Sequence, residues 1–204
     1  MSDAVTTLRE WLVKESDQGV VLIAIGPQPN LRKLLQSVAE EHSALSGIDL
    51  VKEKVSQIVI MGGAFPEGKE WNFEMCPQSA QYVVAHSPIP IMFTGFEIGY
   101  DIMTGARLCM EAPEDHPVRK AYERFLGQAG NRHSWDLTAI LYGVRGLANY
   151  WETTVAGGCI EVDSNGTNRW LSNPDKGHRY LQCKMAPQAI STVLDELLAG
   201  YLRT

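Results

Sequence analysis

The stretch IVIMGGAF at residues 58–65 decides the fold of this chain, together with EWNF at residues 70–73. Residues 58–61 are a continuous apolar run, which is typical of a strand buried on both faces of a parallel sheet. Gly62 and Gly63 follow directly. Because neither has a Cβ, they either form a plain turn or let the backbone approach a ligand closely. The stretch therefore predicts a buried strand that ends at a turn.

The same pattern recurs through the first half of the chain. Residues 20–25 and 89–93 are further apolar runs; Gly26 directly follows the first, and Gly95 closes the second after Thr94. We expect residues 20–25 to be buried on both faces as well. Helices are predicted at residues 5–14, at residues 31–38 with Asn30 as N-cap, and from Pro77 onward. This alternation predicts an α/β fold with a mostly parallel sheet flanked by helices, in which ligands bind beyond the carboxyl ends of the strands.

The second half has a different character. Helices are predicted at residues 117–128, 134–148 and 187–202, and residues 159–170 read as a hairpin with a primed turn at Asn165-Gly166. With 204 residues and 45% hydrophobic composition, a single domain over residues 1–204 is the expected organisation.

Charge and cysteine content limit the possible partners. The net charge of -6 is spread without blocks of like charge, which argues against nucleic acid and against a membrane surface as partners. There is no apolar run of the roughly 20 residues that a membrane span needs. The four cysteines lack C-x-x-C spacing and predict reduced thiols in a cytoplasmic protein. A small molecule or a second copy of the chain is the expected partner.

Polar residues near the predicted strand ends are candidates for ligand binding. Glu70 and Asn72 would lie on one side of an extended segment, where they can hydrogen-bond a polyol, although exposed loops are also rich in such residues. Asp136 lies at the start of a predicted helix, where a carboxylate is a cap, an ion-pair partner or a metal ligand, and Ser134 is the better N-cap candidate. Trp135 packs in the core or stacks on a flat ring.

Two further residues have alternatives that the sequence leaves open. His133 is either a general acid or a surface histidine. Glu97 is either a carboxylate near the ligand or a residue that caps the next helix near its amino end. The other histidines have no metal-binding spacing, and the sequence contains no G-x-S-x-G, Walker or G-x-G-x-x-G motif.

These residues together resemble the inosine-uridine-preferring nucleoside hydrolase family, which cleaves the N-glycosidic bond of ribonucleosides with the help of a calcium ion. The segments that carry the resemblance are VVLIAIGP at 20–27 with Asn30, VIMGGAF at 59–65, EWNF at 70–73 and SWDLTAILY at 134–142. The resemblance implies the family's α/β fold and a ribonucleoside or ribose as ligand. The Ser-Trp-Asp sequence at 134–136 is similar to that of a subgroup of the family.

The resemblance also implies roles for individual residues. Asp136 and the backbone carbonyl of Ile25 are expected to bind calcium. The residues expected to bind substrate are Met61, Glu70, Asn72 and Trp135, of which Asn72 and Trp135 are the expected catalytic residues. Trp135 stands where many members have a histidine that assists the leaving base.

The sequence also departs from the family pattern. Cys76 precedes Pro77 where many members have aspartate, the loop between Gly63 and Glu70 is short, and the amino-terminal motif D-x-D-x-x-x-D-D is absent. In the family those aspartates hold calcium and activate the attacking water. Since calcium takes about six to eight oxygen ligands, the expected site in this chain is incomplete.

Several expectations follow from these departures. The chain should correspond to about the carboxyl-terminal two-thirds of the family fold, truncated at the amino-terminal strands and followed by a helical and hairpin part. Hydrolysis by this chain alone should be weak or absent. The alternatives are a catalytically silent module that binds ribose or nucleosides or serves in assembly, and an enzyme in which Glu70 or Glu97 activates water. Residues 20–25 should lie near an exposed sheet edge, which favours a homo-oligomer or a longer gene product.

Overall fold

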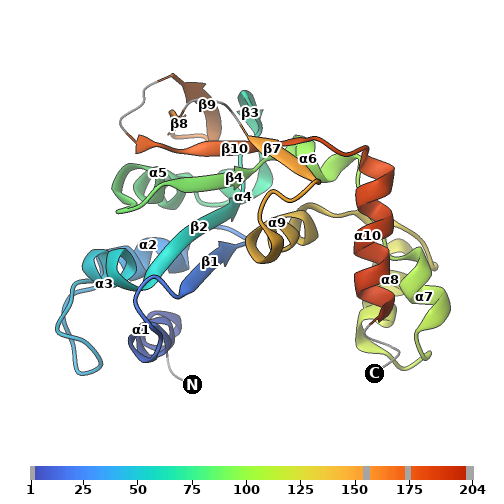
Figure 1. Ribbon diagram of the computed structural model, residues 1–204, viewed down its shortest axis with the longest axis horizontal. Coiled ribbons are helices and arrows are strands. Elements are labelled where there is room, and N and C mark those ends of the chain that lie inside the picture. Colours follow the sequence, from blue (N-terminus) through green and yellow to red (C-terminus); the bar gives the residue numbers. More distant parts are fainter. Residues whose placement is uncertain (1–2, 154–156, 173–175, 201–204) are drawn as a thin grey trace. The chain divides into compact units, whose positions relative to one another are not determined.

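The structure is a computed structural model that describes residues 3–153, 157–172 and 176–200 (Figure 1). The chain divides into two compact units. The first unit comprises Met1–Phe96 and Thr153–Leu181, and the second comprises Glu97–Glu152 and Gln182–Thr204.

A parallel sheet forms the centre of the first unit. Four of its five strands follow the order β1 (Val20–Ala24), β2 (Val55–Met61), β4 (Ile91–Thr94) and β10 (Arg179–Cys183), and each neighbouring pair among these four is parallel. The fifth strand in the order is β7 (Trp151–Thr153). In the register of the sheet, Ala24 pairs with Ile60, which pairs with Phe93. The strands β1, β2 and β4 therefore end at one edge, where the glycines after them gather. This confirms the predicted α/β fold and its mostly parallel sheet.

Helices pack their apolar residues against this sheet (Figure 1). They are α1 (Ala4–Lys14), α2 (Pro29–Gln36), α3 (Gly47–Lys54), the short α4 (Trp71–Glu74) and α5 (Pro77–His86). Ile58 and Ile60 of β2 and Phe93 of β4 lie in the same buried cluster as leucines and valines from α1, α2, α3 and α5. Pro77 is the first residue of α5, as predicted, because its fixed φ suits that position.

The strand β1 differs from the prediction that residues 20–25 are buried on both faces. Its residues are only half-buried, apart from Val21, which is exposed. The physical reason is its place at the end of the strand order, where no described strand pairs with its outer side. The prediction of an exposed sheet edge at these residues is confirmed.

The helix α2 begins and ends earlier than predicted. Gln28, and not Asn30, is at the N-cap, and the N–H of Arg32 donates to the Gln28 carbonyl at 2.9 Å. Pro29 fits the first helical position, which places Asn30 inside the helix. Ser37 ends it, so Val38 lies beyond the helix and is exposed.

A second, antiparallel sheet in the first unit has the order β3 (Glu67–Lys69), β9 (Thr167–Leu171) and β8 (Cys159–Val162). The predicted hairpin is confirmed, but its turn is not a primed two-residue turn. The Gly166 N–H donates to Asp163 O, the Asp163 N–H donates to Thr167 O, and only Gly166 has positive φ (+87°). This is the pattern of a type I turn followed by a bulge, which a glycine in the left-handed region allows.

The second unit is mostly helical. Its elements are α6 (Phe96–Tyr100), β5 (Met103–Thr104), α7 (Ala106–Glu111), α8 (Pro117–Leu126), β6 (Arg132–His133), α9 (Trp135–Arg145), β7 (Trp151–Thr153) and α10 (Pro187–Gly200). Phe96, the first residue of α6, and Thr153, the last residue of β7, belong to the first unit. The strands β5 and β6 are antiparallel, with Met103 opposite His133. The helix α10 attaches to β5, since Ser191 Oγ accepts from the Met103 N–H at 3.0 Å.

The three helices predicted in this half are present, with different ends. The helices α8 and α9 end at Leu126 and Arg145, because Gly127 and Gly146 follow with positive φ. The predicted end of the last helix at residue 202 lies outside the described residues. Within the described part of the chain, no helix combines the length and apolar character needed to cross a membrane.

A buried histidine makes the stability of the first unit sensitive to acid. His178 is 1% exposed, its Nδ1 has no partner among the described residues, and burial together with the charge of Lys176 lowers its pKa from 6.5 to about 4. The unfolded chain takes up this proton near pH 6.5, whereas the folded chain takes it up only near pH 4. Stability is therefore fully present above pH 6.5 and is lost as the pH falls toward 4.

We expect His178 alone to lower the free energy of unfolding by up to about 3 kcal/mol between pH 6.5 and pH 4. His178→Gln, which carries no titratable group, should flatten this part of the curve in urea unfolding followed by circular dichroism. His86→Gln, at an exposed histidine, is the control and should retain the wild-type dependence. Equal pH dependence of the wild type and His178→Gln would contradict this prediction.

Candidate functional site

A buried carboxylate organises the turn that follows β2. Glu70 is 5% exposed and is the N-cap of α4. Its Oε1 accepts from the Asn72 N–H at 2.9 Å, and its Oε2 accepts from the N–H groups of Gly63 at 3.2 Å and Phe73 at 3.4 Å. The sequence suggested that Glu70 and Asn72 share one side of an extended segment. In the structure Glu70 is extended and caps α4, whereas Asn72 lies within that helix.

The side chain of Asn72 is held against the end of β2. Its Nδ2 donates to the carbonyl oxygen of Met61 at 3.1 Å and contacts Met61 Sδ at 3.2 Å. Both residues are buried. The amide nitrogen is thus engaged by Met61, and Oδ1 is the part of Asn72 that can accept a hydrogen bond from a hydroxyl. The structure thus brings Met61, Glu70 and Asn72 together at the carboxyl edge of the sheet.

The two glycines of this turn have different roles. A Cβ on Gly62 would lie 2.5 Å from the ring of Phe73, so packing already requires a glycine there. Gly63 has φ of +79°, which favours glycine. The next residue is fixed by Asn168 of β9, whose side chain accepts from the Ala64 N–H and donates to the Ala64 carbonyl, both at 2.8 Å. The antiparallel sheet therefore holds the turn in place.

Two buried oxygen atoms at the same edge have no hydrogen-bond partner among the described residues: Thr94 Oγ1, at the end of β4, and Gln28 Oε1, beyond the end of β1. Thr94 pairs with Met61 in the register of the sheet. An unpaired buried polar atom is unfavourable, and such atoms often mark places where a ligand or an ion belongs. Sequence reasoning missed both residues, and the only signal was that Thr94 is a polar residue at the end of an apolar run.

In the second unit, the start of α9 positions Trp135. Ser134 is at the N-cap, as predicted, but its hydroxyl makes no capping bond and instead contacts Thr104 Oγ1 at 2.6 Å. The Ser134 N–H donates to Gly99 O at 3.2 Å and to Ile102 O at 2.9 Å. A Cβ on Gly99 would lie 2.4 Å from Trp135 Cα, so this glycine permits the close approach of α6 to α9.

Asp136, the predicted calcium ligand, is the second residue of α9 and has an exposed side chain. Desolvation by the surrounding protein raises the pKa of its carboxyl, and the charge of Arg132 opposes this rise. Asp136 forms no ion pair within the described residues. Glu97 is exposed and lies in the first turn of α6, where a negative charge favours a helix.

The oxygens present do not by themselves suit calcium. Ile25, whose carbonyl is the other predicted ligand, follows β1 and is 40% exposed. It belongs to the first unit and Asp136 to the second. One carboxylate and one carbonyl fall short of the about six to eight oxygens that calcium takes. These two residues alone therefore do not form a calcium site.

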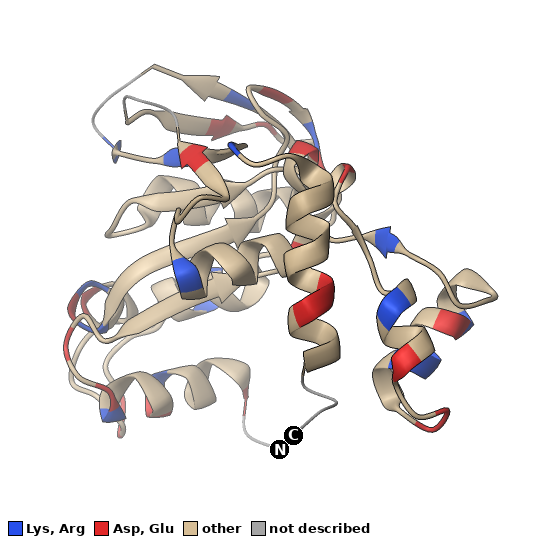
Figure 2. Cartoon of the chain, turned by 45° about the vertical axis from the view of Figure 1, so that its right-hand side comes forward, with Lys and Arg blue, Asp and Glu red and all other residues tan. Residues whose placement is uncertain are grey.

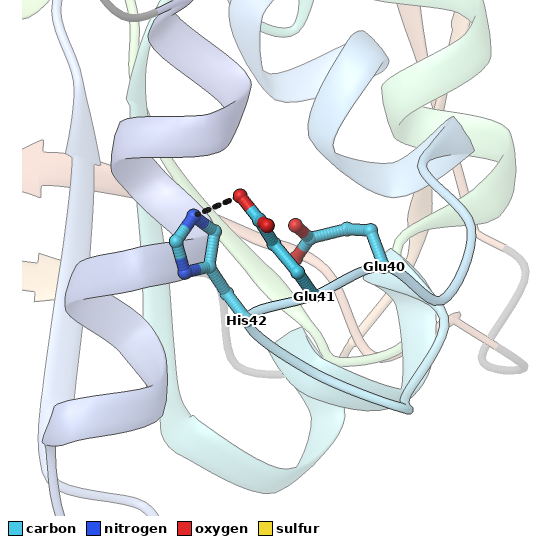
Figure 3. Close-up of side chains that lie close together, drawn as sticks. All are labelled: Glu40, Glu41 and His42. Carbon is cyan, nitrogen blue, oxygen red and sulfur yellow. Dashed lines mark ion pairs between the residues drawn. The ribbon is translucent and has the colours of Figure 1, made fainter.

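A different cluster of potential metal ligands lies in the loop after α2 (Figure 3). Ligand atoms of Glu40, Glu41 and His42 lie within 4.8 Å of one another, and His42 Nε2 is 3.6 Å from Glu41 Oε1. Glu40 also accepts from the buried Arg9 at 2.8 Å. Arg9 additionally donates to the Leu45 carbonyl at 2.8 Å, so Glu40 takes part in fixing this loop.

Charged residues elsewhere are mixed in sign. Figure 2 shows Lys and Arg interspersed with Asp and Glu along the described ribbon. Many form local pairs, such as Arg107 with Glu111 and Arg119 with Glu123. This mixture agrees with the charge distribution of the sequence.

Comparison with known proteins identifies relatives of the chain. No protein-family model matches it. The pyrimidine-specific ribonucleoside hydrolase RihA of Klebsiella pneumoniae is 36% identical over 92 residues, which cover 43% of this chain and 26% of RihA. The chain therefore matches only about a quarter of the length of these curated relatives.

Solved structures extend the similarity over nearly the whole chain. An inosine-guanosine nucleoside hydrolase superposes with a TM-score of 0.71 at 16% identity, covering 97% of this chain and 68% of the other. The inosine-uridine-preferring nucleoside hydrolase of Bacillus anthracis gives a TM-score of 0.66 at 16% identity, covering 97% and 65%. These structures establish the fold. The predicted resemblance to nucleoside hydrolases is supported by the sequence over part of the chain and by the fold over nearly all of it.

The unpaired hydroxyl of Thr94 leads to a prediction about stability. Thr94→Val removes a buried hydroxyl that has no partner among the described residues, so we expect the midpoint of thermal unfolding to stay unchanged or to rise by a few degrees, equivalent to about 1 kcal/mol. Thr104→Val removes a buried hydroxyl that contacts Ser134. This second variant should lower the free energy of unfolding by about 1–3 kcal/mol. Calorimetry of both variants checks the contrast, and a marked loss of stability in Thr94→Val would contradict it.

Proposed function

We propose that the chain binds ribonucleosides and acts in the cleavage of their N-glycosidic bond to ribose and free base. The observation that supports this proposal is the position of Glu70 and Asn72, which follow β2 in the chain and lie at the carboxyl edge of a parallel sheet. Ligands of open α/β sheets bind at that edge. The relationship to ribonucleoside hydrolases gives the class of ligand.

In this proposal the first unit holds the sugar. Asn72 Oδ1 accepts a hydrogen bond from a ribose hydroxyl, because the amide nitrogen is engaged by Met61. The Glu70 carboxylate fixes the amides of Gly63 and Asn72 and adds negative charge near the sugar. Negative charge there stabilises the oxocarbenium-like transition state of glycosidic cleavage. Met61 contributes an apolar surface beside the sugar ring.

Within the second unit, Trp135 and Asp136 are the residues proposed to act on a ligand. Trp135 offers a flat aromatic surface for a nucleobase, since stacking on an aromatic side chain suits any base. Asp136 is a proposed ligand for calcium, and the backbone carbonyl of Ile25 is a separate proposed ligand in the first unit. These two oxygens do not suffice for calcium, which takes about six to eight oxygen ligands.

The shortage of calcium ligands favours a second candidate function. In this alternative the chain is a module that binds ribose or nucleosides without cleaving them. It retains the same arrangement of Met61, Glu70 and Asn72. The two functions differ in turnover and not in binding.

Two further properties belong to the proposal. The exposed edge of β1 is the surface through which we propose that copies of the chain assemble into a homo-oligomer. The cysteines Cys76, Cys109, Cys159 and Cys183 are all free, in keeping with a cytoplasmic protein that has reduced thiols.

Titration calorimetry with ribose, inosine and uridine, with and without calcium, tests this function when it is combined with an assay for released base. We expect binding by the wild type and at least about tenfold weaker binding by Asn72→Ala, which corresponds to about 1.4 kcal/mol. Release of base indicates the hydrolase, whereas binding without release indicates the binding module.

The matched control is Asn149→Ala, which removes an exposed asparagine of the second unit. It should bind like the wild type. No binding of any of the three ligands by the wild type would reject both functions. Binding by the wild type that Asn72→Ala leaves unchanged would reject the role of Asn72.

A further inference from the structure

The hairpin of β8 and β9 contacts the candidate sugar site at two places, both within the first unit. The side chain of Asn168 in β9 reaches Ala64, in the turn after β2. At the tip of the hairpin, Gly166 packs on α4, because a Cβ there would lie 2.7 Å from Glu74 Cα. The hairpin therefore touches both of the segments that the Glu70 carboxylate joins.

The side-chain amide of Asn168 satisfies both backbone groups of Ala64. Its Oδ1 accepts from the Ala64 N–H and its Nδ2 donates to the Ala64 carbonyl, both at 2.8 Å. Asn168 is 1% exposed, so water has little access to its amide. A planar amide that both accepts and donates replaces the pair of bonds that a neighbouring strand would supply. The side chain thus fixes the position of Ala64.

A second contact confines Ala64. Gly68 lies directly opposite Asn168 in the pairing of β3 with β9. A Cβ on Gly68 would lie 2.7 Å from the Cβ of Ala64. Because Ala64 has no flexible side chain that could yield, a larger residue at position 68 must displace the backbone of one of the two. Gly68 therefore offers an independent way to disturb the contact between Ala64 and Asn168.

The position of Ala64 bears on the sugar residues through its neighbour Gly63. The Gly63 N–H donates to Glu70 Oε2 at 3.2 Å, and Oε1 of the same carboxylate accepts from the Asn72 N–H at 2.9 Å. A shift of Ala64 moves the Gly63 amide, and the carboxylate that caps α4 then loses or follows this donor. Such chains of hydrogen bonds carry energetic coupling between residues that do not touch.

We propose that Asn168 is a positioning residue, which sets the affinity of the sugar site by holding the turn after β2 in the conformation that ribose binds. The inference rests on the proposed function, in which Asn72 binds ribose. Asn168 acts through Ala64 and makes no contact with the sugar. The gain in affinity comes from preorganisation, because the turn does not have to be ordered when the ligand binds.

Amide hydrogen exchange of the ligand-free protein, followed by NMR, tests the positioning. In Asn168→Ala we expect the amides of Gly63 and Asn72 to exchange about tenfold faster than in the wild type, since their bonds to Glu70 open more often. Both amides donate to Glu70 and not to Asn168, so the loss of a direct partner does not explain this effect. Gly68→Ala, which keeps Asn168, should act in the same direction.

The matched control is Gln81→Ala. The Gln81 Nε2 donates to the Val162 carbonyl at 3.0 Å, so this variant also removes a side-chain hydrogen bond to the hairpin, but at β8. It should leave the exchange of the Gly63 and Asn72 amides within about twofold of the wild type. Equal acceleration in Gln81→Ala and Asn168→Ala would show a general loosening of the hairpin and would overturn the inference.

Titration calorimetry with ribose gives the functional readout. Asn168→Ala and Gly68→Ala should each bind ribose about tenfold more weakly than the wild type, because part of the binding free energy is then spent on ordering the turn. Gln81→Ala should bind ribose like the wild type. If Asn168→Ala does not fold, Gly68→Ala provides both measurements.

The outcomes separate the inference from the function on which it rests. Wild-type exchange of the Gly63 and Asn72 amides in Asn168→Ala and Gly68→Ala would overturn the inference. Faster exchange with unchanged affinity for ribose would overturn it too, because the order of the turn would then not set the affinity. If the wild type binds no ribose, the proposed function fails and the role in affinity with it, whereas the exchange rates still show whether Asn168 orders the turn.

Discussion

The hydrogen bonds of the Glu70 carboxylate are the constraint on which the candidate sugar site depends. One buried side chain fixes the amide of Gly63 after β2 and two amides at the start of α4. These contacts bring the turn and the short helix together and place Asn72 against the end of the strand. A charged group accepting three N–H bonds is well compensated for its burial. Any role of Glu70 toward a ligand is thus linked to its role in shaping the turn.

The sequence was informative about the fold where a local pattern has only one stable outcome. Continuous apolar runs correctly predicted β2 and β4, since strands buried on both faces carry such runs. Pro77 likewise correctly predicted where α5 begins. The strand β10 went unpredicted, because Arg179–Cys183 has only one fully buried apolar residue, Leu181, and obtains its place by pairing with β4.

The candidate site was predictable as a set of residues but not as a set of contacts. Met61, Glu70 and Asn72 do lie together, but a two-residue spacing could not reveal that Glu70 caps a helix. The orientation of His133 and the close approach of Gly99 to Trp135 depend on Tyr100 and on α6, about 33 residues earlier in the chain. Contacts over such separations follow from tertiary packing and leave no periodic trace in the sequence.

The route of the chain through its two units has a consequence for protein engineering. The chain changes unit after Phe96, after Glu152 and after Leu181. A single cut at any one of these points would leave at least one fragment without a complete unit, and an amino-terminal fragment ending at Phe96 would lack β9, whose Asn168 fixes Ala64. Producing either unit alone therefore requires two segments to be joined by a designed linker, so deletion mapping by simple truncation would be misleading for this protein.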